Sequence, residues 1–531
     1  MPVARLLSVH AVLAGLALAS LGMVAPAARA AGGDIGYRDQ SYAPLGGSPT
    51  SSKPESKLWF NNGWWASMYN AGAGEHRIYK LNSALGVWSD SGVAIDKRAS
   101  SRADALWDAG SKKLYVASHV YTTSGTATTS GSAGRLYRYS YDAAGDRYAL
   151  DPGFPVTVNA AKTETLVIDK DSTGTLWATW TQGSRVYVNH TLGGNDAAWG
   201  TPYVVPGPGT TLTSDDISSV IHFGGNKIGV MWSNQADHNF YFSVHADGAG
   251  DASWSTSAVP SAAAGSDDHI NLKADSAGRV YAAVKTAANN KSPDSTPEIL
   301  LLVRSAGGAW GSATFGSAAD SETRPIVLLD EQHGLIHMFA TCPQPPSTSG
   351  QAGGDICEKT TSMSSPSFAA GIGTAVIRDA SSPKMNDATS TKQEVDGGTG
   401  IVVMANNAST DSYWHMQESL GAPPSAPAPA PVPKPARTSP RLRITSKRWR
   451  GLRLYVRGTL SRKATGRVKV SYLKGRPGKR IRARKSATIK RGHFAVSLRL
   501  PRRARGHKAI LWASYGGDRS YLAQAVRARV R

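Results

Sequence analysis

The chain has 531 residues, a net charge of +22 and two cysteines. This length exceeds what one hydrophobic core usually supports, so we expect more than one domain. Beyond the N-terminal segment no stretch has about 18 continuous apolar residues, which excludes a later membrane-spanning helix. The sequence has no phosphate-binding loop and no G-x-S-x-G or H-E-x-x-H motif, so nucleotide chemistry is disfavoured.

The N-terminus has the features of a secretory signal peptide. Arg5 precedes an apolar run from Leu6 to about Val24, and Ala28-Arg29-Ala30 gives the pattern that signal peptidase recognises. A membrane anchor is the competing interpretation, but polar residues interrupt the run and a cleavage pattern ends it. We therefore expect residues 1–30 to be removed and the protein to be secreted, remaining extracellular or associated with the cell surface.

A segment rich in proline and alanine, residues 421–440, separates two parts of opposite charge. Such a segment favours extended polyproline geometry and acts as a spacer. Residues 441–531 hold 29 lysines and arginines and one acidic side chain, Asp518, which amounts to +28. Since the whole chain carries +22, residues 1–440 carry −6. The sequence therefore predicts a large, slightly acidic domain over residues 34–420 and a small, strongly basic one.

A repeated turn and strand organise the large domain. Asp171-Ser172-Thr173-Gly174 and Asp275-Ser276-Ala277-Gly278 are D-x-x-G turns, in which the aspartate bonds nearby backbone and glycine supplies a positive φ. Taking the strand after each turn as a marker, we find seven similar segments that begin 50 to 66 residues apart. They begin at Trp64, Leu114, Leu176, Ile228, Val280, Leu335 and Ile401.

Each interval holds about four short strands and almost no helical periodicity. This pattern predicts an all-β fold, a seven-bladed β-propeller, with a six-bladed ring and one decayed repeat as the alternative. Over roughly residues 50–418 the repeats resemble the sialidase-like and BNR-type propellers of secreted carbohydrate-active proteins. The turn has one more residue between aspartate and glycine than the family's S-x-D-x-G-x-T-W box. The resemblance implies carbohydrate binding.

Charged residues precede the first strand of every predicted blade. In a propeller these positions meet around one funnel, so we expect a polar pocket able to hold a sugar acid. The alternative is that these positions are polar only because they face solvent at a rim. The expected ligand-binding residues are Lys57, Arg102, Asp104, Glu164, Asp216 and Lys384.

Three chemistries fit these residue types. In a lyase, His269 would exchange a proton and Asp268 or Asp216 would tune it. A uronate would be neutralised by Arg324, Arg102, Lys57 or Lys384. Paired carboxylates would instead serve glycoside hydrolysis. A Ca²⁺ ion held by Asp215, Asp216, Asp267 and Asp268 is a further possibility, because hard cations take several carboxylate oxygens. No other cofactor is expected.

The two cysteines, Cys342 and Cys357, fall within one repeat. In an oxidising compartment, two cysteines 15 residues apart on neighbouring strands favour a disulfide over free thiols.

The basic segment 441–531 alternates apolar and polar residues in six or seven short strands, which predicts a small β-sandwich. Its sequence from Tyr515 to Tyr521, YGGDRSY, resembles the Y-x-G-D-x-x-Y signature of bacterial Ig-like repeat domains. Its charge density predicts attraction to anionic cell-surface polymers. The alternative is an arginine-biased composition on a solvated surface.

Together these features lead to one hypothesis and two alternatives. We expect a secreted, monomeric propeller that recognises an extracellular polysaccharide or glycan and is retained on anionic surfaces by a basic Ig-like domain. The alternatives are a polysaccharide lyase or glycoside hydrolase acting in the funnel, and a non-catalytic structural adhesion protein. Fold alone does not decide among them.

Overall fold

The structure is a computed structural model that describes residues 33–530 except 52–53, 99, 123–131, 261–263, 290, 422–436, 475–480 and 505–507. The predicted signal peptide and most of the predicted linker lie outside the described residues. The chain divides into two compact units, Met1–Pro424 and Ser425–Arg531. Among the described residues, no helix has the length and apolarity needed to cross a membrane.

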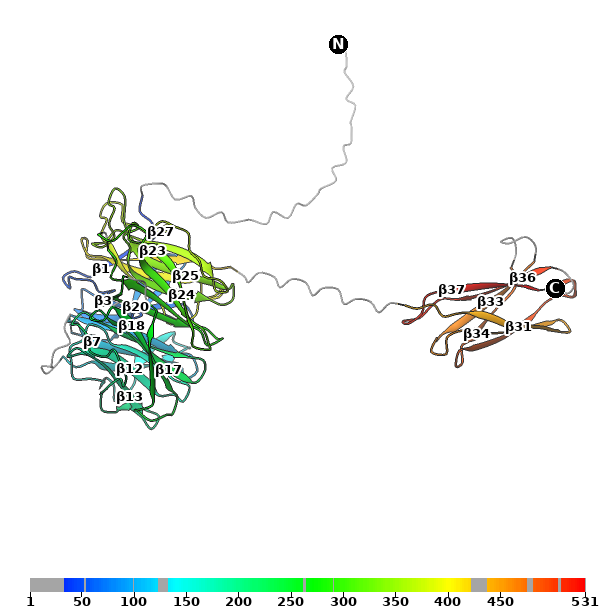
Figure 1. Cartoon of the computed structure of the whole chain (residues 1–531), viewed down its shortest axis with the longest axis horizontal. Coiled ribbons are helices and arrows are strands. Elements are labelled where there is room, and N and C mark those ends of the chain that lie inside the picture. The colour runs from blue at the N-terminus through cyan, green and yellow to red at the C-terminus, as the bar shows by residue number, and fades with distance from the viewer. Residues whose placement is uncertain are drawn as a thin grey trace, which may run out of the picture. The chain divides into compact units, whose positions relative to one another are not determined.

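The described part of the first unit contains seven antiparallel sheets, each of four or five strands (Figure 1). The first three sheets consist of β2 (Leu58–Phe60), β3 (Trp64–Asn70), β4 (Glu75–Asn82) and β5 (Val87–Ala94); β6 (Ser101–Asp108), β7 (Lys113–Val120), β8 (Arg135–Asp142), β9 (Arg147–Leu150) and β10 (Val156–Thr157); and β11 (Val167–Lys170), β12 (Leu176–Gln182), β13 (Arg185–Leu192), β14 (Asn195–Trp199) and β15 (Tyr203–Val204).

The other four sheets follow in chain order. They consist of β16 (Ser218–Phe223), β17 (Lys227–Asn234), β18 (Asn239–Ala246) and β19 (Trp254–Val259); β20 (Ser266–Ala274), β21 (Val280–Thr286), β22 (Pro297–Arg304) and β23 (Trp310–Ser317); β24 (Thr323–Asp330), β25 (Leu335–Cys342), β26 (Asp355–Ser362) and β27 (Thr374–Ile377); and β28 (Met385–Thr389), β29 (Ile401–Asn407) and β30 (Ser412–Glu418) with the N-terminal β1 (Tyr37–Ser41). Each of the seven marker segments lies in the second strand of a different sheet.

The last sheet is completed from the other end of the chain. Strand β1 pairs antiparallel with β30, and Tyr37 lies opposite His415. The pairing covers an otherwise open sheet edge. The short polar sequence of β1 does not predict a strand.

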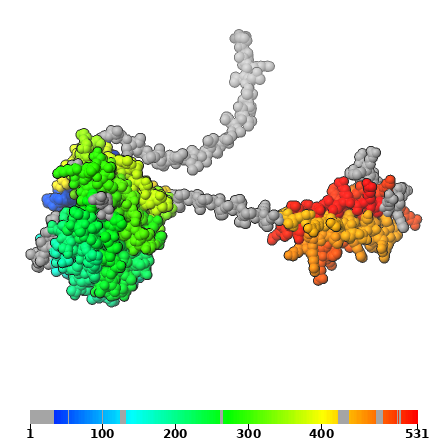
Figure 2. Space-filling model, in the orientation of Figure 1, coloured from blue at the N-terminus to red at the C-terminus, as the bar shows by residue number. Residues whose placement is uncertain are grey.

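The first strands of the seven sheets are neighbours. In chain order, β2, β6, β11, β16, β20, β24 and β28 each contact the next. The series closes on itself, because the backbone N–H of Leu58 donates to the Ser390 carbonyl at 3.2 Å. This arrangement of antiparallel sheets is consistent with a β-propeller. In the space-filling view the cyan, green and yellow segments cover one continuous face of the unit (Figure 2).

Side chains of neighbouring sheets interlock to form the core. Ile270 and Leu272 of β20 pack in one buried cluster with Ile221 and Phe223 of β16. Small residues of the second strands, such as Ala282 in the same cluster, allow the sheets to approach closely. The apolar positions that predicted each strand are therefore the positions that hold adjacent sheets together.

The D-x-x-G turns have the structural role that their sequence predicts. In the first, Gly174 has φ +88°, and the Asp171 carboxylate accepts hydrogen bonds from backbone N–H groups and from the Trp177 indole at 2.9 Å. In the second, Gly278 has φ +81° and the Asp275 carboxylate accepts from the Tyr281 hydroxyl at 3.0 Å. In both turns the aspartate anchors an aromatic side chain six residues later.

The second unit is built from two antiparallel sheets. One has the order β31-β32-β35, and the other has the order β34-β33-β36-β37. Their bounds are β31 (Arg443–Arg450), β32 (Arg453–Thr459), β33 (Arg467–Lys474), β34 (Ile481–Thr488), β35 (His493–Arg499), β36 (Ala509–Tyr515) and β37 (Gln524–Val530). Inward-facing apolar residues of both sheets share one buried cluster, so the unit is a β-sandwich.

Candidate functional site

Carboxylates from three sheets converge where the first strands begin. Glu164 precedes β11, Asp215 precedes β16 and Asp268 lies near the start of β20. One ligand atom of each lies within 4.8 Å of the others. Glu164 and Asp268 are buried and Asp215 is exposed. Three residues spread over about a hundred positions of the sequence therefore share one site, which we call the acidic cluster.

A second group overlaps the acidic cluster at Asp268. Asp267, Asp268 and His269 also offer ligand atoms within 4.8 Å of one another. His269 Nδ1 lies 2.6 Å from Asp268 Oδ1 and 3.1 Å from Asp267 Oδ1, and its Nε2 lies 3.5 Å from the Thr323 hydroxyl. The imidazole is largely buried but stays at the strand starts, where it contacts the next sheet. A proton on Nδ1 would be donated to carboxylate, which leaves Nε2 able to accept one.

Lys285 and Glu298 extend the site along the same sheet. The Lys285 ammonium forms an ion pair with Asp267. Glu298 is fully buried, and its Oε1 accepts a hydrogen bond from Gln351 at 3.0 Å. Burial raises the pKa of Glu298 to about 7, although the positive charge of Lys285 opposes this shift. Its Oε2 has no hydrogen-bond partner among the described residues.

Local irregularities of the backbone direct side chains toward this face. Strands β20, β24 and β28 each carry a register shift near their start. Arg324 and Asp387 lie at two of these shifts with φ +56° and +55°, and Arg324 Nε lies 2.8 Å from Asp387 Oδ1. Bulges often redirect side chains beside functional sites. Arg324 is thus paired with a carboxylate of the next sheet, not with His269.

Arg102 lies at the start of β6 and is largely buried. Its guanidinium donates to the Ser51 hydroxyl and the Ser101 carbonyl, both at 3.1 Å, and stacks over the Tyr121 ring. Burial lowers its pKa, although Glu55 opposes the shift.

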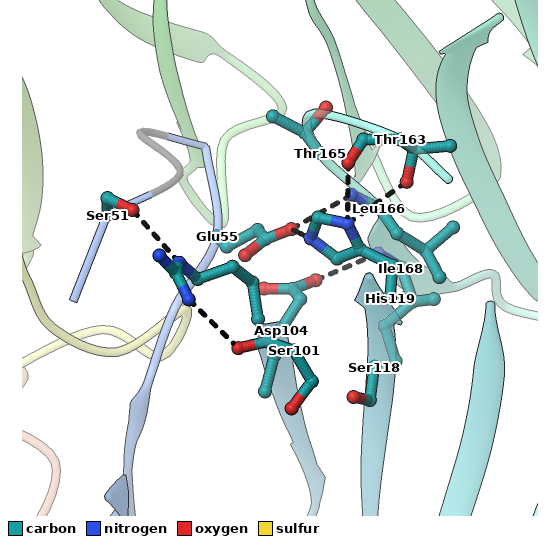
Figure 3. A network of polar contacts seen from close by, with 12 residues as sticks. Ser51, Glu55, Ser101, Asp104, Ser118, His119, Thr163, Thr165, Leu166 and Ile168 are labelled. Carbon is teal, nitrogen blue, oxygen red and sulfur yellow. Dashed lines mark hydrogen bonds and ion pairs between the residues drawn. The ribbon is translucent and has the colours of Figure 1, made fainter. Parts of the chain in front are cut away.

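Glu55, Asp104 and His119 belong to a network of polar contacts in the interior (Figure 3). Glu55 points toward His119, and its Oε1 lies 2.7 Å from His119 Nε2. Its Oε2 lies 2.7 Å from the Lys57 ammonium, which also donates to the Ala103 carbonyl. Burial would raise the pKa of Glu55, but Lys57 and His119 outweigh it and lower that pKa to about 2. Lys57 is therefore an interior residue held by Glu55.

Asp104 joins sheets in the same interior. Its carboxylate accepts from the backbone N–H groups of Ser56 and Ile168, both at 2.8 Å, and lies 3.1 Å from the Lys392 ammonium. Burial raises its pKa, and Lys392 opposes the shift. Asp104 is fully buried, and these contacts occupy both of its carboxylate oxygens.

The two other predicted ligand-binding residues are placed differently. Asp216 is fully buried, and its carboxylate accepts from Thr213, Ser233 and Gln235. These contacts hold the local turn. Lys384 is exposed, and its ammonium donates to the Ala352 carbonyl at 3.4 Å.

The structure thus brings together Glu164, Asp268 and His269 of the predicted residues, and adds Asp215 and Asp267 from the predicted calcium set. Three carboxylates with one exposed member suit a hard cation, since Ca²⁺ takes six to eight oxygens and completes its shell with water. His269 would add a nitrogen only for a softer ion.

Sequence reasoning missed Glu55, Lys285 and Glu298. Glu55 stands two residues before Lys57 in an irregular segment, so no strand pattern marked it. Lys285 and Glu298 lie at the end of a second strand and the start of a third, which also reach this face. A search extended to both ends of every strand would have included the latter two.

The disulfide lies beside this face, at the end of β25. Cys342 and Cys357 are bonded to each other, with a Cα–Cα distance of 5.8 Å. Their strands β25 and β26 are paired, so the bond closes a 15-residue separation across a hairpin.

No protein-family model matches this chain, and no curated protein matches it. Similar solved structures include a PL25 ulvan lyase bound to -[GlcA(1-4)Rha3S]-, with 11% identity, coverage of 73% of this chain and 95% of that chain, and a TM-score of 0.43. AofleA from Arthrobotrys oligospora gives 9% identity, 65% and 91% coverage, and a TM-score of 0.41. A leech intramolecular trans-sialidase has 12% identity, coverage of 72% of this chain and 70% of that chain, and a TM-score of 0.35. At these identities and TM-scores the likenesses assign no activity, so we derive the function from the site residues.

Proposed function

We propose that the first unit is a secreted seven-bladed propeller that binds an extracellular glycan at the face where its first strands begin. The observation that carries this proposal is the convergence of Glu164, Asp215 and Asp268 from three sheets into one partly exposed cluster. Carboxylate oxygens from separate sheets that lie this close together can accept several hydrogen bonds from one polyhydroxylated ligand, or bind one hard cation.

The chemistry of the face favours a polyhydroxylated ligand. Carboxylates accept hydrogen bonds from sugar hydroxyls, and the cations Arg102, Arg324 and Lys384 lie at strand starts of the same ring. The side chains identified at this face are polar, which disfavours an apolar ligand. We further propose that Ca²⁺ binds at the acidic cluster and bridges it to the glycan.

A binding screen with the full-length protein tests this function. Neutral and uronate-containing polysaccharides are presented at about 0.5 M NaCl, which screens the basic second unit. We expect binding that is weakened by a calcium chelator and lost in Asp268→Asn. Asp90→Asn is the matched control, since Asp90 is a partly exposed carboxylate on the outer strand β5. Equal binding by wild type and Asp268→Asn would refute the site.

One observation favours a second candidate, a polysaccharide lyase. Asp268 holds His269 Nδ1 at 2.6 Å, an arrangement that orients Nε2 as a proton acceptor. In β-elimination, Nε2 would take the proton beside the uronate carboxylate while the glycosidic oxygen leaves with its electron pair. Incubation with uronate polysaccharides would then produce unsaturated-bond absorbance together with reducing ends. Reducing ends without that absorbance would indicate hydrolysis, and neither product would leave only binding.

We propose that the second unit is an Ig-like domain that retains the protein on anionic surfaces. Its strand order and its Asp518 turn support the Ig-like assignment. The Asp518 carboxylate accepts from Thr465, Ser520 and Tyr521, so the resembling motif ties two loops together. The exposed lysines and arginines support retention, because polyanions exchange their counterions for such groups.

A further inference from the structure

The outer face of the four-stranded sheet in the second unit carries an exposed indole between two arginines. Trp512 of β36 is 40% exposed. It lies opposite Ser471 of β33 on one side and Arg527 of β37 on the other. Ser471 in turn lies opposite Arg484 of β34. These four residues form one row across the sheet.

Both arginines are held near the indole. The Arg527 guanidinium lies 5.4 Å from the Trp512 ring centroid. Arg484 Nε donates to the Ser471 hydroxyl at 3.4 Å. Since neighbouring strands lie about 4.8 Å apart, the backbones of Arg484 and Arg527 are about 14 Å apart with the indole between them.

No acidic side chain of the unit neutralises this row. Lys469 and Arg529 add exposed cations in adjacent rows of the same sheet. Asp518 is the one acidic side chain in residues 441–531, and loop groups already occupy its carboxylate. The face therefore presents positive charge around an aromatic surface.

We propose that the face centred on Trp512 is a binding site for an acidic polysaccharide. A sugar ring stacks on the indole, and carboxylate or sulfate groups on the flanking sugars contact Arg484 and Arg527. This inference rests on the proposed retention role and assigns it a place and a ligand class. It differs from a diffuse electrostatic attraction because it requires one aromatic side chain.

The geometry favours a polysaccharide over a single-stranded nucleic acid. Proteins that bind single strands offer aromatic platforms to successive bases. In the part of this sheet that the structure describes, Trp512 is the one large aromatic residue with an exposed ring on the outer face. A chain in which acidic groups flank an uncharged sugar face matches one platform between two cations.

The opposite sheet supplies a matched control. Tyr455 of β32 is 41% exposed and lies between Arg448 and Ser497. Arg453 donates to the Ser497 hydroxyl at 3.4 Å, as Arg484 does to Ser471. The two faces thus match in the exposure of their aromatic side chain and in one arginine–serine contact. They differ in that one carries the indole of Trp512 and the other the phenol ring of Tyr455.

The test measures heparin binding by the full-length protein and its variants at several salt concentrations. For nucleic-acid bases, loss of one aromatic platform typically lowers affinity by a factor of about 5 to 150. We expect Trp512→Ala to weaken heparin binding about tenfold without changing how steeply affinity falls with salt. Tyr455→Ala should change heparin affinity less than twofold. Trp512→Tyr keeps a ring and should retain most of the affinity, which separates lost stacking from lost folding.

Charge variants locate the anionic contacts. Arg484→Ser with Arg527→Ser should weaken binding more than Arg453→Ser with Arg457→Ser, although both remove two charges. Equal effects of the two pairs, or equal effects of Trp512→Ala and Tyr455→Ala, would overturn the Trp512 site and leave retention by diffuse charge. Tighter, Trp512-dependent binding of single-stranded DNA would also overturn it, in favour of a nucleic acid. If no polyanion binds at all, both the Trp512 site and the proposed retention role are wrong.

Discussion

In the first unit Glu55, Lys57 and His119 meet in the interior, whereas in the second unit Arg450, Arg453 and Arg499 lie opposite one another on exposed strands. Glu55 and Lys57 lie in one segment before β2 and His119 lies in β7, and the Glu55 carboxylate pairs with both of the other groups. The three arginines are neighbours of like sign, which costs stability. Charge in this interior network therefore stabilises the fold, while charge at these positions of the second unit opposes it.

The largest loss of stability is expected when one partner is removed from the interior network. Glu55→Ala leaves the Lys57 ammonium buried without its carboxylate, which typically costs about 3–5 kcal/mol. Denaturant unfolding should show this loss in the first unit. The partly exposed Asp90, paired with Arg77, is the control, and Asp90→Ala should cost less than about 1 kcal/mol. A similar small loss for Glu55→Ala would mean that the interior charges contribute little.

The disulfide offers a second difference between the units, since the second unit has no cysteine. Replacing both Cys342 and Cys357 by serine should lower the unfolding free energy of the first unit by about 3 kcal/mol, because the unfolded chain gains freedom. Calorimetry should show the transition of the second unit unchanged. Two titratable thiols in the folded wild-type protein would contradict the bond.

The exposed charges of the second unit predict a salt effect. Heparin affinity of the full-length protein should fall about tenfold or more between about 50 mM and 200 mM NaCl, because bound cations release condensed counterions. Glycan binding at the acidic cluster should fall much less over the same range. An affinity for heparin that does not change with salt would indicate recognition without ionic contacts.

The smallest expected effect is a pH dependence in the first unit. The pKa of Glu298 is raised by burial from its ordinary value of 4.5 to about 7, so its protonated form favours the folded state. Its contribution to stability is full below pH 4.5 and is lost as pH rises through about 7. Glu298→Gln should therefore raise Tm relative to wild type at pH 8 and change it little at pH 5. The same shift at both pH values would assign the effect to packing.

The elements that the sequence predicted best depend on local chemistry. The apolar segments that follow the turns predicted the seven second strands, and the D-x-x-G turns follow from backbone geometry at Gly174 and Gly278. The pairing of β1 with β30 could not be predicted, since YRDQS is a short polar segment whose partner lies more than 370 residues away.

For the candidate site, the sequence showed which residues stand at strand starts but not which way they turn. Asp215 and Asp216 are adjacent, yet one is exposed at the acidic cluster and the other is buried in a turn. Register shifts near the starts of β20, β24 and β28 break the strict alternation on which such a prediction depends.

The all-β class, the repeated strands and the basic character of residues 441–531 can be read from the amino-acid sequence, because apolar patterning and charge are properties of neighbouring residues. The tertiary structure brings Glu164, Asp215 and Asp268 into one cluster, pairs Glu55 with His119, and places Trp512 between Arg484 and Arg527. The physical reason is that these contacts join different strands or sheets, and sheet pairing and packing set them, not spacing along the chain.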